Sequence, residues 1–190
     1  MSLSGNAETS PPHVAGSFYP AAKSELTYQV ANFLSNVPAK EIKGEIIALI
    51  VPHAGYPFSG QVAAYAYKEL AGRAFDRVVL IGASHRLSFD HLAVPSYGRF
   101  ATPLGELPVD QEFISRLVKL SGRIKIDNAP FDKDDNALEV QLPFLQTVLK
   151  ETKIVPVFFG NISLANCQAL AYALSLLVDD RTLIIASSDL

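Results

Sequence analysis

Three residues with metal-binding side chains follow apolar, strand-like runs of the sequence. His53, His85 and Asp189 each lie within four residues of the end of such a run. Two imidazoles and a carboxylate with open positions form the facial triad of non-haem Fe(II) oxygenases. A similar set holds zinc and activates a water for hydrolysis. We therefore interpret His53 and His85 as candidate metal ligands, and Asp189 and His85 as candidate catalytic residues.

The same three residues also have structural interpretations, which spacing alone leaves open. His53 and His85 fit turn histidines that bond to nearby backbone, because no local spacing of the H-E-x-x-H type supports a metal site. Asp189 fits a metal ligand, a base, an acceptor that orients an imidazole, or the N-cap of a helix. The metal site therefore depends on whether these side chains meet in the fold.

Four further residues are weaker candidates, for the wall of a substrate pocket. Tyr56 fits a pocket wall or the core. Ser84 fits a pocket wall or a turn, because Gly82–Arg86 lacks the second glycine of a nucleophile elbow. Asn136 and Glu139 are three residues apart, which is the spacing of a capping box, so a helix cap is their simplest role.

The elements that must position these residues alternate along the chain between strand-like and helix-like runs. This alternation predicts an α/β fold, with a mostly parallel central sheet and helices on both faces. Hydrophobic periodicity predicts strands over residues 45–51, 77–81, 153–159 and 182–186, and helices over 24–37, 60–71, 110–122, 136–150 and 164–178.

Local signals refine these elements. Ser24 and Ser59 are the expected N-caps of the first two helices. The continuous β-branched run Glu45–Val51 is typical of a strand buried on both faces. Pro143 is expected to kink its helix, and Pro156 indicates an edge position or a bulge in its strand, because proline cannot donate a backbone hydrogen bond.

The chemistry is expected at one edge of this sheet. Ligands of open α/β sheets bind outside the carboxyl ends of the strands. Neighbouring strands lie about 4.8 Å apart. If the strands that precede His53 and His85 are neighbours, the two imidazoles lie within reach of one shared metal.

Composition excludes several classes of protein. The chain has 190 residues, of which 49% are hydrophobic and 18% charged, so it is predicted to fold rather than to be disordered. Its net charge of -3 and dispersed basic residues argue against binding to nucleic acid or anionic membranes. No apolar stretch approaches the roughly 18 residues of a membrane span. We expect a flexible leader over 1–12 and a single domain over 13–190.

The cysteine count and the N-terminus bear on location. Cys167 is the only cysteine, which fits a reducing compartment. It shares an apolar helix face with leucines, so we expect it to be buried. The segment Met1–Asn6 lacks the charged and apolar regions of a signal peptide. The expected location is the cytoplasm.

Five motifs in one order resemble the Memo family, whose prokaryotic members are called AmmeMemoRadiSam system protein B. They extend from His13 to the last residue, so the resemblance covers nearly the whole chain. The motifs are His13–Pro20, Val51–Gly60, Gly82–His85, Leu138–Leu145 and Ala186–Leu190.

The resemblance implies a Memo-like fold related to the LigB-like catalytic subunits of class III extradiol dioxygenases. In those enzymes two histidines and a carboxylate hold Fe(II). Carried over by motif, His53 and His85 resemble the metal-binding histidines, and Asp189 resembles a member of the same pocket. The implied cofactor is Fe(II), with Zn(II) as an alternative. The implied ligand is a small aromatic molecule or a peptide side chain, and the family name suggests a radical-SAM partner.

Two departures from the family pattern shape the expected function. Family members usually have Glu-His where this chain has Asp135 and Asn136, and an amide cannot act as a general acid or base. Family chains also continue past the Ser-Ser-Asp motif, so we expect a domain without its C-terminal part, with doubtful metal occupancy and a tendency to form homo-oligomers.

Three functions remain open at this point. The first is that of a metal-dependent, dioxygenase-like enzyme. The second is that of a non-catalytic binding or signalling protein that keeps the dioxygenase-like fold and its pocket. Zinc hydrolysis is a third, less favoured interpretation, because the resemblance points to oxygen chemistry.

Overall fold

A six-stranded sheet forms the centre of the protein. The computed structural model describes residues 8–40 and 42–189. The strand order is β2-β9-β3-β8-β4-β7, and all neighbours are parallel except β8 and β4. The predicted mostly parallel α/β sheet is thus confirmed. The strands are β2 (Ala48–Pro52), β3 (Arg77–Ala83), β4 (Leu92–Val94), β7 (Ile124–Ile126), β8 (Lys153–Phe159) and β9 (Thr182–Ser188).

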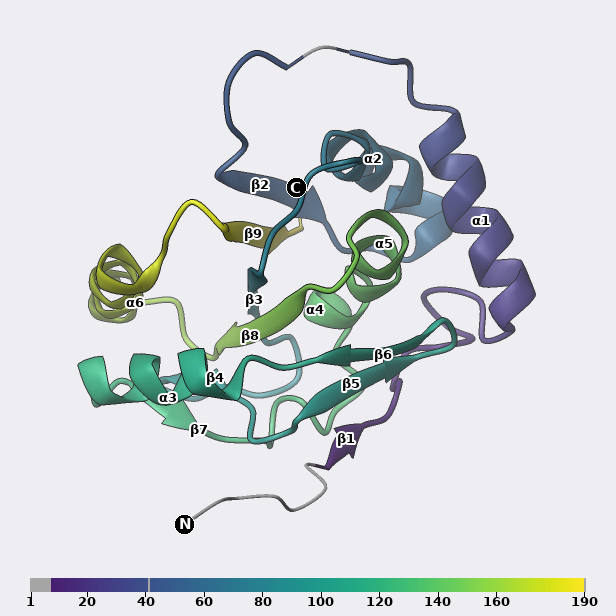
Figure 1. The fold of residues 1–190 in the computed structure, drawn as a ribbon. Helices are drawn as coiled ribbons and strands as arrows, with labels where there is room; N and C mark the ends of the chain where they lie inside the picture. Colours follow the sequence, from purple (N-terminus) through teal and green to yellow (C-terminus); the bar gives the residue numbers. More distant parts are fainter. Residues whose placement is uncertain (1–7, 41, 190) are drawn as a thin grey trace.

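Helices cover both faces of this sheet (Figure 1). The connections β2–α2–β3 and β8–α6–β9 run in opposite directions across it, so right-handed crossovers place α2 and α6 on opposite faces. Helices α1 and α5 pack against α2, whereas α3 packs against α6. The helices are α1 (Lys23–Ser35), α2 (Tyr56–Lys68), α3 (Gln111–Leu120), α4 (Asn136–Glu139), α5 (Leu142–Val148) and α6 (Leu164–Leu177).

A second, three-stranded sheet holds the beginning of the described chain. Its strands are β1 (Thr9–Ser10), β5 (Arg99–Thr102) and β6 (Gly105–Pro108), in the order β1-β5-β6. Residues 1–7 of the expected leader lie outside the described residues. Thr9 and Ser10, by contrast, pair with Arg99 and Phe100 of β5.

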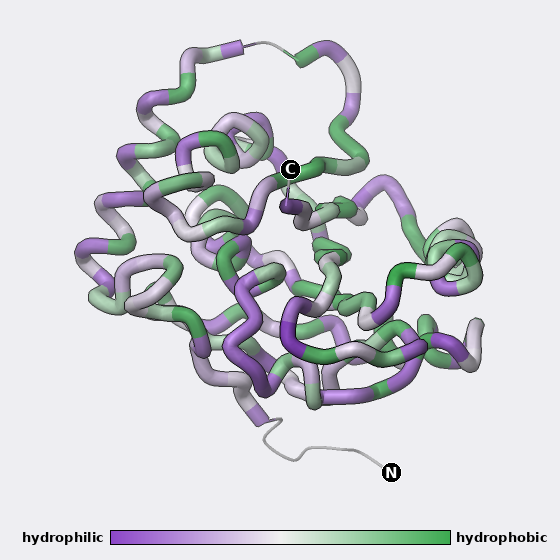
Figure 2. Tube along the Cα trace, turned by 180° about the vertical axis from the view of Figure 1, so that it is seen from behind, coloured by the Kyte–Doolittle hydropathy of each residue, from purple (hydrophilic) through white to green (hydrophobic). Residues whose placement is uncertain are grey.

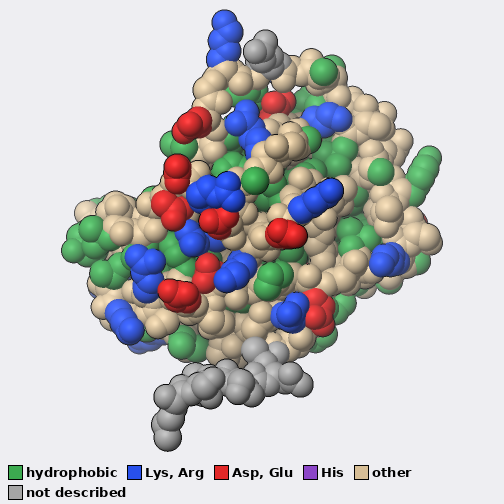
Figure 3. Space-filling model, in the orientation of Figure 1, with side chains coloured by type: hydrophobic (Ala, Val, Ile, Leu, Met, Phe, Trp, Pro, Cys, Tyr) green, Lys and Arg blue, Asp and Glu red, His purple; other side chains and the backbone are tan. Residues whose placement is uncertain are grey.

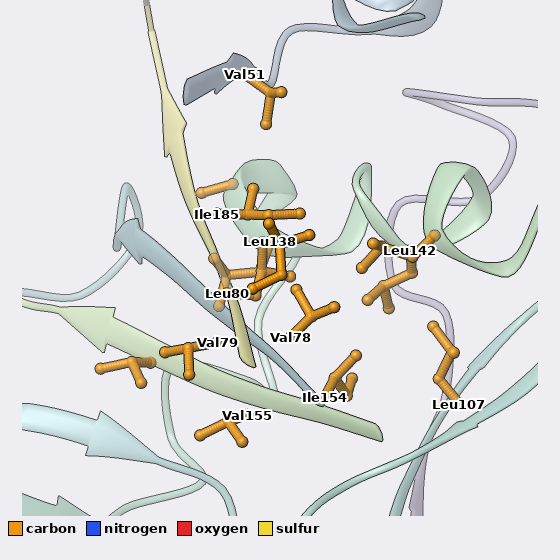
Figure 4. Close-up of a cluster of buried hydrophobic side chains, with 14 of the residues drawn as sticks. Val51, Val78, Val79, Leu80, Leu107, Leu138, Leu142, Ile154, Val155 and Ile185 are labelled. Atoms are coloured by element: carbon orange, nitrogen blue, oxygen red, sulfur yellow. The ribbon is translucent and has the colours of Figure 1, made fainter. Parts of the chain in front are cut away.

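The core lies between the central sheet and the helices on both of its faces, and α3 and α6 contribute Phe113 and Leu170 on the side opposite α2. Leu138 of α4 lies near Leu80 of β3 and Ile185 of β9, as Figure 4 shows. Gly82 makes this close approach possible, since a Cβ atom there would lie 2.7 Å from Leu138 Cδ2. A larger residue at position 82 would push α4 away from the sheet.

The central strands agree with their sequence patterns, but β2 does not. The run 45–51 was predicted to be a strand buried on both faces, yet Ile47, which precedes β2, and Ile50 within β2 are exposed. The reason is its position: β2 is the outermost strand of the sheet, and α2 packs against it on the other face. Burial on both faces is therefore a property of β3, whose Val78, Val79 and Leu80 are all fully buried.

Pro156 occupies an interior strand, so its predicted edge position is wrong. Strand β8 pairs with β3 along its whole length, and Pro156 lies opposite Leu80. On the other side of β8, the ladder with β4 begins only at Phe158, and Ile154 forms an isolated bridge with Val109. Pro156 lies between these two contacts, where β8 has no strand partner on that side. A missing N–H is tolerated there.

Three predicted helix caps differ from the structure. Helix α1 begins after Ala22, so Ser24 lies within it. Helix α2 begins earlier than predicted, and the Ser59 hydroxyl donates to the Ala54 carbonyl from within the helix. The cap of α4 is Asp135, whose carboxylate accepts from the N–H of Ala137, so Asn136 is the first helical residue rather than the cap.

The predicted helix over 136–150 is two helices. Helix α4 ends at Glu139, and α5 begins at Leu142 with Pro143 in its first turn. Proline lacks the N–H that an interior helical bond needs, so a break before it replaces the predicted kink. Only Val140 and Gln141 separate the two helices, and both keep right-handed helical dihedral angles.

The surface carries both charged and apolar side chains. Basic and acidic side chains are interspersed on the face shown in Figure 3, and hydrophobic ones gather over α6. The exposed side chains of α6 include Leu164, Tyr172 and Leu176. Along α1, hydrophobic and hydrophilic residues alternate (Figure 2). Among the described residues, no helix combines the length and apolar character that a membrane crossing requires.

Candidate metal centre

The order of three strands brings the candidate ligands together. His53 directly follows β2, His85 lies two residues beyond β3, and Asp189 directly follows β9. The sequence placed the two histidines within reach of one metal if β2 and β3 were neighbours, but β9 lies between these two strands. Because all three strands are parallel, their carboxyl ends meet at one edge of the sheet, with Asp189 between the two histidines.

The three side chains converge on one point at this edge. His53 Nε2 lies 2.8 Å from Asp189 Oδ1 and 3.0 Å from His85 Nε2. His85 Nε2 lies 3.7 Å from Asp189 Oδ2. The residues offer ligand atoms that all lie within 4.8 Å of one another. This spacing is short enough for a single ion to contact all three.

His53 is held in place from the protein side. The residue is 2% exposed, and its Nδ1 lies 3.1 Å from the hydroxyl of Ser187. The Asn136 amide donates to the His53 carbonyl at 2.6 Å. Burial lowers the pKa of His53, the Asp189 carboxylate acts in the opposite direction, and His85 adds to the lowering. Burial therefore favours the neutral imidazole, which is the form that binds a metal.

Asp135 positions the loop that carries His85. One carboxylate oxygen of Asp135 accepts from the His85 N–H at 2.8 Å and from the Ser84 hydroxyl at 3.1 Å. The other oxygen caps α4 through the N–H of Ala137. One buried carboxylate thus joins the end of β3 to the start of α4.

A cleft of about 460 Å³ opens beside the cluster. His53, His85 and Asp189 line it, and the side chains of Phe159 and Ile162 contribute apolar surface. Cys167 also lines this cleft and is exposed, so its predicted burial is wrong. Cys167 lies on the side of α6 that faces the carboxyl ends of the strands rather than the interior of the protein.

The four predicted pocket residues do not line this cleft. Tyr56 is buried in the aromatic core, and its hydroxyl donates to the Val140 carbonyl at 2.8 Å. Ser84 and Asn136 support the loops around the cluster through the hydrogen bonds described above. Glu139 lies elsewhere, beside the N-terminal segment.

Glu139 anchors that segment from α4. Its carboxylate accepts from the Tyr19 hydroxyl at 2.5 Å and from the N–H groups of His13 and Val14 at 2.8 and 3.0 Å. Burial raises the pKa of Glu139, while these three donors act in the opposite direction. The His13–Pro20 motif therefore has a structural role here, as the segment that Glu139 holds.

Three residues of the site were not recognised from sequence. They are Asp135, Gln141 and Ser187, and each acts through a contact distant in sequence. Asp135 had a usable signal, because aspartate before an apolar helix is a common N-cap. Gln141 and Ser187 lie within two of the family motifs, but nothing in the sequence indicated their partners, which are set by the packing of the segment after α4 against β2 and β9.

These features define a class: α/β proteins that carry a His-His-Asp cluster at the carboxyl edge of a mostly parallel sheet. A family model described as Memo-like protein matches residues 10–190. The chain therefore belongs to the Memo-like family, as its motifs had indicated.

Curated relatives agree with this assignment. The chain is 33% identical to a MEMO1 family protein of Caldivirga maquilingensis, over 96% of this chain and 68% of the relative. It is 33% identical to the protein memo-1 homolog of Caenorhabditis elegans, over 100% of this chain and 54% of the relative. It is 34% identical to protein MEMO1 of Xenopus laevis, over 92% of this chain and 60% of the relative. The chain thus spans 54–68% of the length of these relatives.

Proposed function

We propose that His53, His85 and Asp189 bind one divalent transition metal, with Fe(II) as the expected ion and Zn(II) as the alternative. The observation that carries this proposal is the convergence of their ligand atoms within 4.8 Å at the carboxyl edge of the sheet. Two imidazoles and a carboxylate are the donor set of the non-haem Fe(II) facial triad.

The surroundings of the cluster fit a metal. The buried imidazole of His53 is favoured in its neutral form, and Ser187 contacts its other ring nitrogen. Such a partner on the far nitrogen is the usual arrangement for a metal-binding histidine. Asp189 is 72% exposed, so the cluster is open to ions and ligands from the solvent side.

We further propose that the adjoining cleft binds a small aromatic molecule and that the whole protein is a metal-dependent, dioxygenase-like enzyme. The apolar wall made by Phe159 and Ile162 supports such a ligand. When bound, Fe(II) would supply the electrons and open positions that oxygen chemistry needs. The residues of this chain would hold the ion and orient the ligand against the apolar wall.

Anaerobic metal binding tests the first part of this proposal. Protein loaded with Fe(II) and freed of excess ion is expected to retain about one ion per chain, and a His53→Ala, His85→Ala double variant is expected to retain none. The matched control is His91→Ala, because His91 pairs with Asp127 outside the cluster. Equal metal content in the wild type and the double variant would refute the site.

Oxygen uptake tests the second part. The Fe(II)-loaded protein is mixed with catechol, and oxygen consumption is followed with and without a chelator. Uptake that requires both Fe(II) and His53 supports the enzyme. Stoichiometric metal without uptake refutes the dioxygenase reaction for this chain with that substrate and leaves the metal site standing.

One observation favours a second candidate, a non-catalytic binding or signalling protein that keeps the fold and the pocket. Asn136 lies beside the cluster, and its amide is already engaged with the His53 carbonyl. An amide cannot transfer a proton near neutral pH, so this position offers no general acid or base. The absence of Fe(II)-dependent oxygen uptake, together with saturable binding of catechol, would favour this alternative.

A further inference from the structure

We infer that Ser187, held by Gln141, is a positioning residue that fixes the tautomer of His53. In this tautomer Nδ1 carries the hydrogen, and the lone pair of Nε2 faces His85 and Asp189. The inference rests on the proposed metal site, because it explains how one ligand of that site is prepared for an ion. It follows from counting hydrogens along a buried chain of hydrogen bonds.

The first step fixes the side-chain amide of Gln141. Its Nε2 lies 2.9 Å from the carbonyl oxygen of Pro52 and 2.8 Å from Ser187 Oγ. A carbonyl oxygen can only accept, so the NH₂ end of the amide faces Pro52. The Tyr67 hydroxyl donates to Gln141 Oε1 at 2.8 Å, which agrees with the same orientation. Both amide hydrogens are then committed, one of them to Ser187.

The second step fixes the hydroxyl of Ser187. This hydroxyl has one hydrogen, and it donates to the carbonyl oxygen of Ala137. Its oxygen already accepts from Gln141, so one lone pair remains. That lone pair faces His53 Nδ1 at 3.1 Å. Since Ser187 has no second hydrogen to give, His53 Nδ1 must be the donor.

The third step concerns the far side of the imidazole. A neutral histidine with a hydrogen on Nδ1 has a lone pair on Nε2. His53 Nε2 is the atom that lies 2.8 Å from the Asp189 carboxylate and 3.0 Å from His85 Nε2. The chain of hydrogen bonds therefore presents an acceptor to the cluster, as a metal ligand requires. In this tautomer no hydrogen lies between His53 Nε2 and the Asp189 carboxylate, so the two acceptors repel each other until a cation binds between them.

Burial makes this assignment firm. Gln141 is 1% exposed, and Tyr67, His53 and Ser187 are also buried. Water cannot readily replace a lost partner in such a chain, so each hydrogen has a defined place. The hydrogen on His53 Nδ1 is thus determined by groups up to three side chains away.

The test reads the tautomer directly in the metal-free protein. Nitrogen-15 NMR of histidine-labelled protein in chelator at pH 7.5 distinguishes protonated from unprotonated ring nitrogens, and a His53→Asn variant assigns the signal. We expect the wild type to show His53 with hydrogen on Nδ1. Ser187→Ala is expected to lose this preference and to bind Fe(II) or Zn(II) about 10- to 100-fold more weakly.

Matched variants separate positioning from stability. Ser187→Thr keeps the hydroxyl and is expected to restore the tautomer and the metal affinity at least in part. Ser59→Ala removes another buried serine hydroxyl, whose bond goes to Ala54, and is expected to leave the His53 signal unchanged. The wild-type spectrum remains decisive even if Ser187→Ala does not fold.

The failure of this inference differs from the failure of the proposed function. A wild-type His53 with hydrogen on Nε2, or an unchanged tautomer in folded Ser187→Ala, overturns the inference while leaving metal binding intact. A wild type with the expected tautomer that binds neither Fe(II) nor Zn(II) overturns the proposed metal site and supports the role of Ser187 in setting the tautomer.

Discussion

Two carboxylates near helix α4 have opposite surroundings. Glu139 is 8% exposed and faces three donors, from Tyr19, His13 and Val14. Asp189 is 72% exposed and faces the Nε2 atoms of two imidazoles. The three donor hydrogens around Glu139 balance its negative charge. Asp189 instead faces the lone pair assigned to His53 Nε2, which is a second acceptor beside its own negative charge.

Whether a carboxylate is surrounded by donors or by other acceptors distinguishes a structural anchor from a binding site better than its residue type does. A buried carboxylate with all its donors in place stabilises the structure and offers nothing to a ligand. A group of converging acceptors gains most from a cation, because only a positive charge satisfies all of them together. Glu139 and Asp189 looked alike in the sequence, since both lie in family motifs at the ends of regular elements.

Glu139→Gln is expected to give the largest effect on stability. The amide presents an NH₂ group where the carboxylate accepted hydrogens, so at least one buried donor loses its partner. The free energy of unfolding is expected to fall by about 3 to 4 kcal/mol, measured by urea denaturation in chelator. Metal affinity of the folded variant is expected to be unchanged, and a loss of affinity would contradict the separation of the two regions.

Tyr19→Phe tests the contribution of a single donor to the Glu139 anchor. It removes one of the three donors to Glu139 and leaves the ring in the core. The expected loss is about 2 kcal/mol, because a hydrogen bond to a charged group disappears without creating a cavity. An effect equal to that of Glu139→Gln would show that the backbone donors contribute little.

His53 is expected to make the free energy of unfolding depend on pH. Burial lowers the pKa of His53, so the unfolded state binds more protons than the folded state at pH values below about 6.5, the ordinary value for histidine. Stability from this group is fully present above that pH and is lost as the pH falls toward the folded pKa. Unfolding in chelator from pH 5 to 8 measures it.

The matched variant for this pH dependence is His53→Asn. It retains an N–H for Ser187 but does not titrate in this range. The difference in stability between wild type and variant is expected to shrink as the pH falls below 6.5. A difference that stays constant with pH would contradict the lowered pKa of His53.

Asp189→Asn is expected to give the smallest effect on stability. An exposed carboxylate at the rim contributes within about 0.5 kcal/mol in the metal-free protein. The same change is expected to weaken Fe(II) binding markedly, because it removes a charged ligand. A large loss of stability in chelator would place Asp189 with the anchors and remove the contrast with Glu139.

Much of the central sheet was predictable because its strands are long and rich in β-branched residues. Strand β8 was predicted with its observed bounds, and β3 and β9 extend only a few residues further. Strands β1 and β4 to β7 were missed, because runs of two to four residues are too short to show the alternation of apolar and polar residues that identifies a strand. The exposed face of β2 was missed because position in the sheet, rather than local pattern, determines it.

The three candidate ligands of the site could be picked out from the sequence, but the residues that support them could not. His53, His85 and Asp189 stood out because chemistry-bearing residues followed strands. The condition that β2 and β3 are neighbours is not met, because β9 lies between them and brings Asp189 between the two histidines. The support from Gln141 and Ser187 depends on long-range packing, which no spacing in a single sequence encodes.

The position of β9 also constrains how the protein reaches its native state. Strands β2 and β3 are close in sequence, yet each pairs with β9, which follows roughly a hundred residues later. Such distant pairings slow folding, because a long loop must close before they form. Any early chain that paired β2 directly with β3 would have to separate them again, so the carboxyl edge takes its final shape only when the last described strand inserts.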